Sequence, residues 1–304
     1  MATTDMEVAF ERPLNALSSL SGFGRWGDDL IDRFDGRTLV RSISAAPDAP
    51  PAAYAADIVP GLTSRLQIAI PGTNAASDVH NLIAGTFVAS HEALAALTDL
   101  AAIDPPIAEL ARRYPGHVPV LVPDPLHALI RSISAQQVNL RWASTIRARL
   151  ALRYGVRLDV GDAFVYAIDA RALAEATIEE LRGLQLTNAK ARSVVAVARA
   201  ARAGELCADE LSRMADDELI AHLTRLPGIG RWSAEWYLAR TLGRPRVVAG
   251  DLGVRKAVGR LYNAGMPSEV DVRRLTEHWD TAATLAQALA LHDLALSPGP
   301  APAR

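Results

Sequence analysis

The segment LPGIGRWSAEW at residues 226–236 constrains the fold of this chain more than any other feature. A proline and two glycines stand between an amphipathic stretch, 216–225, and an aromatic-rich stretch, 232–242. Proline ends helices, and glycine permits turns and close backbone approaches that a side chain would forbid. The pattern therefore predicts two helices joined by a tight turn, which is a helical hairpin.

The turn of this hairpin has the features of an anion site. The first N–H groups of a helix have no intrahelical partner, and the helix dipole adds positive potential at that end. We expect Gly228, Ile229, Gly230 and Arg231 to bind the phosphate backbone of DNA. From the hairpin alone, an ordinary turn with its N–H groups facing water is an equally good interpretation.

A lone carboxylate follows the hairpin, at the start of another helical pattern. Asp251 stands between Gly250 and a helix that begins at about Leu252, a place where aspartate commonly serves as the N-cap. It also lies 21 residues beyond Gly230 (251 − 230), a separation that a helix and a return loop can span. The residue could therefore cap the helix, face the hairpin, or do both.

Composition and charge limit the other possibilities. A chain of 304 residues, 50% hydrophobic and 22% charged, suits one large globular domain or two smaller ones. Cys207 is the only cysteine, which excludes an intrachain disulfide, a four-cysteine iron–sulfur cluster and a structural zinc site. The net charge is −2, yet residues 131–153 and 181–202 each carry five basic residues and no acid. Such stretches suit a phosphate-binding face, although solvated helix faces are the more common explanation.

The pattern of short segments changes near residue 104. Three short segments rich in β-branched residues predict strands, at 36–43, 64–70 and 84–90. The alanine-rich segment that follows, 91–102, predicts a helix. From there the sequence predicts helices nearly to the end, with breaks at 115–125, 155–161, 227–230 and 243–253. We therefore expect an α+β fold with a small β-rich domain at 1–103 and a helical domain at 104–304.

One helix start and the absence of two targeting features complete this outline. Asp124 should cap a helix with Pro125 at its first position, and apolar residues at helical spacing should face the core, namely Leu126, Leu129, Ile130 and Ile133. The N-terminus shows no secretion signal, and no uncharged apolar run reaches the ~18 residues that span a bilayer. We expect a protein of the cytoplasm with no membrane partner.

The hairpin and the segments around it resemble the helix-hairpin-helix DNA glycosylase superfamily, and within it the bacterial alkylation-repair branch, DNA-3-methyladenine glycosylase II. The resemblance rests on LTRLPGIGRWSAEWYLARTLG and VVAGDLGVRKAV, on DPLHALIRSISAQQVNLRWASTIRARLALRYG and on LRGLQLTNAKARSVVAVARAARAGEL. It covers residues 104–260, is weaker over 34–103 and is poor after 265. It implies a mostly α-helical glycosylase fold, with the helix-hairpin-helix at 216–243 and the catalytic aspartate loop at 244–255.

The resemblance implies a monofunctional DNA N-glycosylase. Such an enzyme flips alkylated purines, of the 3-methyladenine and 7-methylguanine type, out of duplex DNA and hydrolyses their N-glycosidic bonds in base excision repair. Asp251 matches the family's catalytic aspartate. Trp232 stands where bifunctional members carry a nucleophilic lysine, which implies an enzyme that leaves an abasic site.

Other positions match the family's residues for holding the base. Trp232 and Trp236 share a helix face and match an aromatic pair that lines the base pocket, where ring faces suit a cationic purine. Gln136 matches a pocket-side glutamine, and Gln137 matches the wedge that fills the gap left by the flipped base. Aromatic core packing and a pair of surface glutamines are the alternative interpretations.

The resemblance implies no required cofactor and no catalytic metal. It suggests a Na⁺ or K⁺ ion at the carbonyls of Thr224, Leu226 and Ile229. The partner would be double-stranded DNA with damaged bases, bound by a monomer at the nucleoid of the bacterial cytoplasm.

The sequence departs from the family's pattern in two places. The C-terminal helix keeps Trp279 without the aromatic residue expected two to three positions later, and an Ala/Pro-rich insertion occupies 44–57. The first leaves the lesion preference open, and the second has no assigned function.

Two other functions are compatible with these residues. A non-catalytic helix-hairpin-helix protein that binds DNA or senses lesions would keep the hairpin but would have no use for Asp251. A glycosylase for oxidised or deaminated bases would keep both. Trp232 argues against the strand-cleaving type but does not name the lesion.

Overall fold

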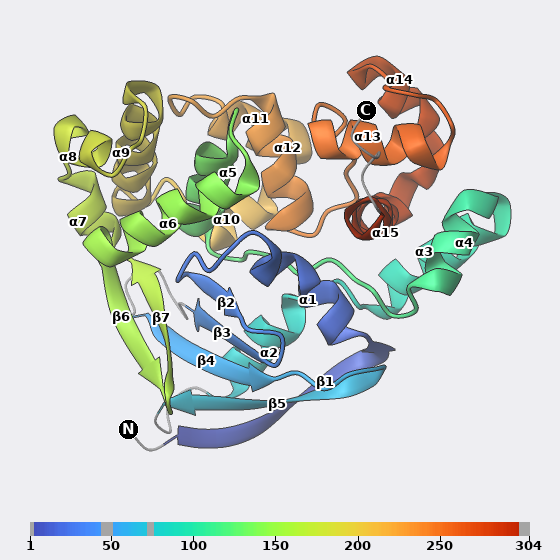
Figure 1. Cartoon of the computed structure of the whole chain (residues 1–304), viewed down its shortest axis with the longest axis horizontal. Helices are drawn as coiled ribbons and strands as arrows, with labels where there is room; N and C mark the ends of the chain where they lie inside the picture. The colour runs from blue at the N-terminus through green and yellow to red at the C-terminus, as the bar shows by residue number, and fades with distance from the viewer. Residues whose placement is uncertain (1–2, 44–50, 72–75, 298–304) are drawn as a thin grey trace, which may run out of the picture.

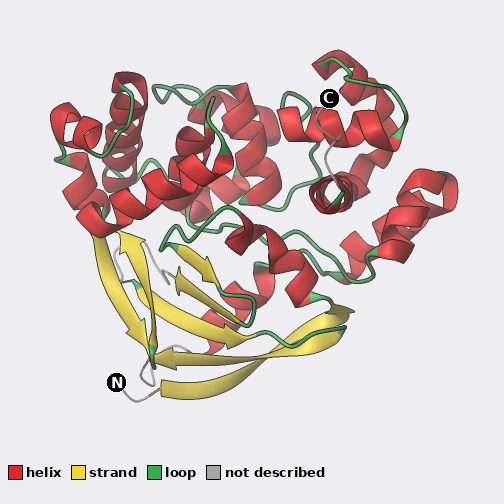
Figure 2. Ribbon diagram, viewed as in Figure 1, coloured by secondary structure: helices red, strands yellow, loops and turns green. Residues whose placement is uncertain are grey.

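The computed structural model describes residues 3–43, 51–71 and 76–297. These residues form an antiparallel sheet with a layer of helices packed over it, as Figure 1 shows. Figure 2 shows the strands gathered in the lower part of the view, with most of the helices above them. The fold class is α+β, as predicted from the sequence.

Within residues 3–43, 51–71 and 76–297, five strands make the main sheet, in the spatial order β1-β5-β4-β3-β2, and every neighbouring pair is antiparallel. They are β1 (Thr3–Leu14), β2 (Asp32–Phe34), β3 (Thr38–Ile43), β4 (Ala52–Asp57) and β5 (Thr63–Pro71). β3 and β5 confirm the strands predicted at 36–43 and 64–70. One face of the sheet is buried against α1 (Ala16–Arg25) and α2 (Ala76–Gly85), where Val8 and Leu66 pair across the strands.

The strand predicted at 84–90 is wrong. α2 extends to Gly85, and Phe87 forms only an isolated bridge with Val120. Phe87 is buried in the cluster beneath the sheet, with its ring centroid 5.3 Å from that of Phe10. The apolar composition of this segment therefore reflects burial rather than strand pairing. Of the Ala/Pro-rich insertion, 44–50 lie outside the described residues and 52–57 form β4.

Helices make up most of the remaining chain. Their bounds are α3 (His91–Ile103), α4 (Pro105–Arg113), α5 (Pro125–Ala135), α6 (Leu140–Tyr154), α7 (Ala170–Ala174), α8 (Ile178–Gly183), α9 (Asn188–Arg202), α10 (Ala208–Arg213), α11 (Asp216–Leu223), α12 (Arg231–Arg240), α13 (Leu252–Leu261), α14 (Glu269–Leu275), the 3₁₀ helix η1 (Glu277–Ala282) and α15 (Ala283–Leu296). α3 confirms the helix predicted at 91–102. The start of α5 is also confirmed, because Asp124 accepts the His127 N–H at 2.8 Å and the four predicted core residues are buried.

A second, two-stranded sheet interrupts the helical part, and the sequence did not predict it. β6 (Gly155–Val160) and β7 (Ala163–Ile168) form an antiparallel hairpin around Gly161, whose φ is 56°. Val160 and Val165 pack with Val40 and Ala53 of the main sheet. The break expected at 155–161 is thus partly a strand, stabilised by contacts with a segment far earlier in the chain. The domain boundary at 103/104 stays a prediction.

Buried ion pairs join the two parts of the fold. Arg131 binds Asp29 at 2.9 Å and Asp32 at 2.5 Å, Arg147 binds Asp29 at 2.8 Å, and Arg41 binds Asp32 at 2.6 Å. Burial alone would raise the pKa of Asp32, but Arg41 and Arg131 hold it well below its usual range. Arg131 and Arg147 belong to the basic stretch for which both a phosphate-binding face and a solvated face were considered. Neither interpretation holds for these two residues, because internal carboxylates bind them.

Candidate active site

The helical hairpin is present as predicted, with α11 and α12 joined by a turn around Gly228. Gly228 has a φ of 78°, and a Cβ added there would lie 2.8 Å from the Ser193 Cβ on α9. The glycine therefore lets the turn pack closely on α9. Ile229 is buried beneath the turn, and Gln136 Nε2 donates to the Gly228 carbonyl at 2.9 Å.

The N-terminus of α12 is open. Its N-cap, Gly230, supplies no side-chain hydrogen bond, so the N–H groups of the first turn remain for water or a ligand. Both Gly230 and Arg231 are exposed, and no atom of the described residues lies within 4 Å of a Cβ added at Gly230. A bulky anion can therefore approach the backbone here. Phosphate binding by this turn stays a prediction.

Asp251 both caps a helix and faces the hairpin. Its Oδ1 accepts the Val254 N–H at 3.0 Å, which makes it the N-cap of α13. Its Oδ2 accepts Nε1–H of Trp232 at 3.0 Å and Nε1–H of Trp236 at 3.4 Å. The backbone of α13 and two side chains of α12 thus orient one carboxylate. The expectation that the chain after the hairpin brings Asp251 back against it is confirmed.

The two tryptophans belong to the site and to the core at the same time. Their ring centroids lie 6.4 Å apart with an interplanar angle of 60°, an edge arrangement rather than two parallel walls. Both rings are half-buried against the hydrophobic cluster of the C-terminal helices, as the core-packing alternative required. Their N–H edges nevertheless point at Asp251, and the Arg240 guanidinium lies 5.2 Å from the Trp236 ring. Their role as a base pocket stays a prediction.

The two predicted glutamines lie at the end of α5, in different surroundings. Gln136 is tied to the hairpin turn through Gly228, and no hydrogen bond among the described residues joins it to Asp251 or the tryptophans. Gln137 is exposed, with a left-handed φ of 54°. Lys190 Nζ donates to the Ser134 carbonyl at 3.0 Å and so steadies this end of α5. The wedge role of Gln137 suits its exposure but stays a prediction.

Arg231 has a partner that the sequence analysis missed. Its Nε donates at 3.0 Å to Glu235, one turn further along α12, and the Glu235 side chain is only 1% exposed. Arg231 itself is 61% exposed, so its remaining N–H groups face solvent. The i,i+4 spacing of the two residues could have suggested the pair.

The C-terminal tryptophan lies in the core. Trp279 is 1% exposed, in η1, and its Nε1 donates to the Tyr262 hydroxyl at 2.7 Å. The hydroxyl of Tyr262 in turn donates to Asp104, at the start of α4. Trp279 therefore stabilises the packing of the C-terminal helices.

The predicted ion site consists of backbone carbonyls. The Leu226 carbonyl accepts the Ile229 N–H at 3.1 Å, and a carbonyl oxygen keeps a second lone pair for a cation. Within the described ranges, no three His, Cys, Asp or Glu side chains gather to hold a metal ion. The monovalent cation at Thr224, Leu226 and Ile229 stays a prediction.

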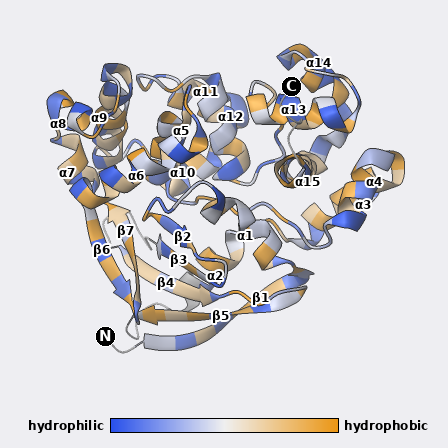
Figure 3. Ribbon diagram, viewed as in Figure 1, coloured by the Kyte–Doolittle hydropathy of each residue, from blue (hydrophilic) through white to orange (hydrophobic). Residues whose placement is uncertain are grey.

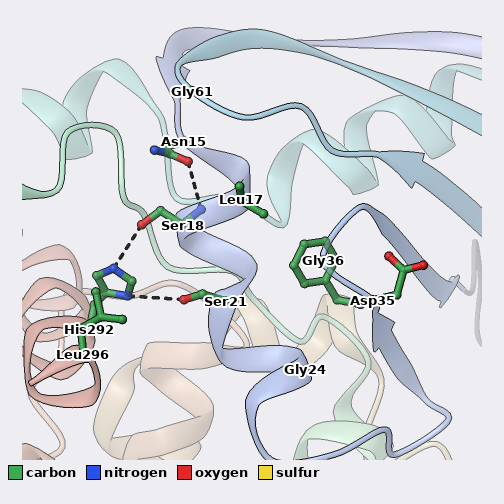
Figure 4. A pocket seen from close by; sticks show the side chains of 11 residues that line it. Asn15, Leu17, Ser18, Ser21, Gly24, Asp35, Gly36, Gly61, His292 and Leu296 are labelled. Atoms are coloured by element: carbon green, nitrogen blue, oxygen red, sulfur yellow. Dashed lines mark hydrogen bonds between the residues drawn. The ribbon is translucent and has the colours of Figure 1, made fainter. Parts of the chain in front are cut away.

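A separate cavity of about 600 Å³ lies between α1, the β2–β3 turn and α15 (Figure 4). Ser18 and His292 line it, and Ser18 Oγ lies 3.2 Å from His292 Nε2 and 3.0 Å from His117 Nδ1. The two imidazoles stack with their centroids 4.1 Å apart, and burial lowers the pKa of His117 to about 3. None of the predicted site residues lines this cavity.

The fold and the site place the chain among the helix-hairpin-helix proteins, because a glycine turn, an open helix N-terminus and a returning aspartate occur together. The chain belongs to the HhH-GPD superfamily of base excision DNA repair proteins, whose family model matches residues 130–281.

Individual relatives carry names from DNA repair. Escherichia coli K12 DNA-3-methyladenine glycosylase 2 is 27% identical over 215 residues, which are 67% of this chain and 74% of that protein. The matches to two Bacillus subtilis relatives span 53% and 61% of those proteins. The structure of a 3-methyladenine DNA-glycosylase from Archaeoglobus fulgidus has a TM-score of 0.80 at 24% identity and covers 96% of this chain and 99% of that one. The Schizosaccharomyces pombe enzyme Mag1, solved with abasic DNA, has a TM-score of 0.55 at 22% identity and covers 64% and 95%.

None of the helices within the described ranges combines the length and apolar character needed to cross a membrane. Figure 3 shows hydrophilic and hydrophobic residues mixed along most of the helices.

Proposed function

We propose that this protein is a monofunctional DNA N-glycosylase that excises alkylated purines, of the 3-methyladenine and 7-methylguanine type, from duplex DNA. The observation that carries the proposal is the Asp251 carboxylate, oriented by Val254, Trp232 and Trp236 beside the hairpin. Membership of a base excision repair family and the names of the relatives support it.

The chemistry suits a single carboxylate. As the C1′–N bond breaks, its electron pair leaves with the base, and positive charge develops on the deoxyribose ring. A carboxylate about 4 Å away stabilises that charge by about 4 kcal/mol at an effective dielectric constant of about 20. Water then adds to C1′, and Asp251 accepts the proton that the water loses. A cationic alkylated purine leaves as a neutral base, so this step needs no acid.

The residue at position 232 supports hydrolysis without strand cleavage. Strand-cleaving glycosylases use an amine to attack C1′, and the indole of Trp232 has no nucleophilic lone pair to offer. Lys256 lies on α13 and is exposed, and no hydrogen bond in the described residues joins it to Asp251. The expected product is therefore an intact strand with an abasic site.

The DNA itself would bind across the hairpin. The open N-terminus of α12 offers N–H groups to one phosphate, with the exposed Arg231 beside it. Gln137 is exposed in the loop after α5, next to the exposed Val138 and close in sequence to the exposed Leu140 at the start of α6. Apolar side chains next to a wedge suit contact with unstacked bases. Within the same proposal, the protein acts as a monomer on bacterial cytoplasmic DNA, and a Na⁺ or K⁺ ion at the hairpin carbonyls steadies the turn.

Base release from methylated duplex DNA tests the proposal. Wild type should release methylated purines, Asp251→Asn should lose nearly all activity, and strand breaks should appear only after alkali. Asp169→Asn is the matched control, because Asp169 caps α7 and asparagine caps a helix equally well. Equal release by wild type and Asp251→Asn would remove Asp251 from the mechanism. Binding without release would favour a non-catalytic protein or another lesion.

A further inference from the structure

Glu235 is a buried carboxylate that the proposed chemistry does not use. Besides Arg231, it binds Arg273 of α14, whose Nη2 lies 2.9 Å from Oε1 and 3.2 Å from Oε2. One carboxylate thus binds two arginines, Arg231 at the start of α12 and Arg273 in α14. Arg273 is 35% exposed, so Glu235 lies beneath two side chains that reach solvent.

Helix stability does not explain this arrangement. A cation at the first position of a helix opposes the dipole, and arginine before glutamate is the less favourable i,i+4 order. A buried ion pair is also weak evidence for stability, because the loss of hydration offsets the attraction. We therefore consider a functional role for the ion pairs of Glu235 with Arg231 and Arg273.

The network also reaches the loop that carries Asp251. Arg273 binds Glu269 at 2.7 Å, and a Cβ added at Gly250, the residue before Asp251, would lie 3.2 Å from Glu269 Oε2. From the other side, α12 holds Asp251 through its two indoles. Contacts from Glu235 through Arg273 to Glu269 therefore connect the hairpin, by way of α14, to the loop that carries Asp251.

We infer that Glu235 is a positioning residue, which holds Arg231 at the hairpin and couples a DNA phosphate bound there to the placement of α12 and Asp251. The inference rests on the proposed glycosylase function. Among the described residues only Nε of Arg231 is bonded, so its Nη groups can bind a phosphate while Nε stays on Glu235. One guanidinium then connects the DNA backbone to the helix that orients the carboxylate.

Glu235→Gln separates binding from chemistry. Without the carboxylate, both arginines keep their charge, so we expect tighter binding to undamaged duplex DNA. The plot of log K against log salt should steepen by about 0.9, as for one more phosphate contact. Base release at saturating enzyme should slow by about 10- to 100-fold, because the catalytic group is less well placed. Glu218→Gln, an exposed acid on α11 with the same charge change, should keep the wild-type rate.

Four outcomes decide the inference. Tighter binding at the wild-type rate in both variants would overturn it, since charge alone would explain the result. A parallel loss of binding, rate and melting temperature in Glu235→Gln would also overturn it, in favour of a purely structural role. If wild type releases no base but only Glu235→Gln changes the salt slope, the proposed function fails while the hold on Arg231 is supported. If Glu235→Gln does not fold, Arg273→Met should slow base release at a similar melting temperature, and a wild-type rate there would overturn the coupling.

Discussion

Gly228 offers the sharpest test of why the hairpin turn has its sequence. We expect Gly228→Ala to lower the free energy of unfolding by about 2–5 kcal/mol, from two separable causes. The left-handed φ of 78° costs alanine about 1–2 kcal/mol. The new Cβ would also lie 2.8 Å from the Ser193 Cβ and closer still to its Oγ, and such overpacking costs about 1–3 kcal/mol.

A second substitution separates the two causes. Ser193→Gly removes both contacted atoms, so in that background Gly228→Ala should cost only the backbone share, about 1–2 kcal/mol. The coupling energy between the two positions is then about 1–3 kcal/mol. Urea denaturation of the wild type, the single variants and the double variant measures it, provided that all four share one m-value.

Gly230→Ala is the control within the same turn. Gly230 has a φ of −97°, and within the described part of the chain nothing lies within 4 Å of an added Cβ. Its replacement should cost about 1 kcal/mol at most, from the poorer N-cap. An equal cost of Gly228→Ala in both backgrounds would refute the contact with Ser193. A cost as small as that of Gly230→Ala would refute the whole account of the turn.

Three further predictions concern the site and the junction of the two parts. Trp232→Phe keeps an aromatic ring but removes the N–H that binds Asp251 at 3.0 Å, so single-turnover base release should fall by about 10- to 100-fold; an unchanged rate would show that this bond is not needed. Gln137→Ala should leave stability within about 0.5 kcal/mol, because the side chain is exposed, and should slow release from fully paired DNA more than from mismatched DNA; equal slowing on both substrates would count against the wedge. Arg41 and Arg131 depress the pKa of Asp32, so its contribution to stability is present above an unfolded pKa of about 3.9 and is lost as pH falls towards the folded value. Acid denaturation below about pH 4 should therefore be shallower in Asp32→Asn, and identical acid slopes would contradict the ion-pair account.

Much of the candidate site could be predicted because its parts obey short-range rules. The hairpin turn follows from a proline and two glycines within a few residues. The cap of α13 by Asp251 and that of α5 by Asp124 follow from an aspartate that directly precedes a helical pattern. These features depend on backbone conformation and on bonds within one helical turn, which neighbouring residues specify.

The remaining features depend on residues that are distant in sequence, and no local pattern specifies them. The β6–β7 hairpin is stabilised by packing against the main sheet, where Val160 and Val165 are buried together with apolar side chains of β3 and β4. From the sequence, Arg131 was predicted to lie on a phosphate-binding or solvated face, but in the folded chain it pairs with Asp29 and Asp32. In the same way, two indoles donate to one oxygen of Asp251, and one glutamate holds arginines from two helices. Such contacts form because burial forces each polar group to find a partner, and packing of the whole chain chooses which partner it finds.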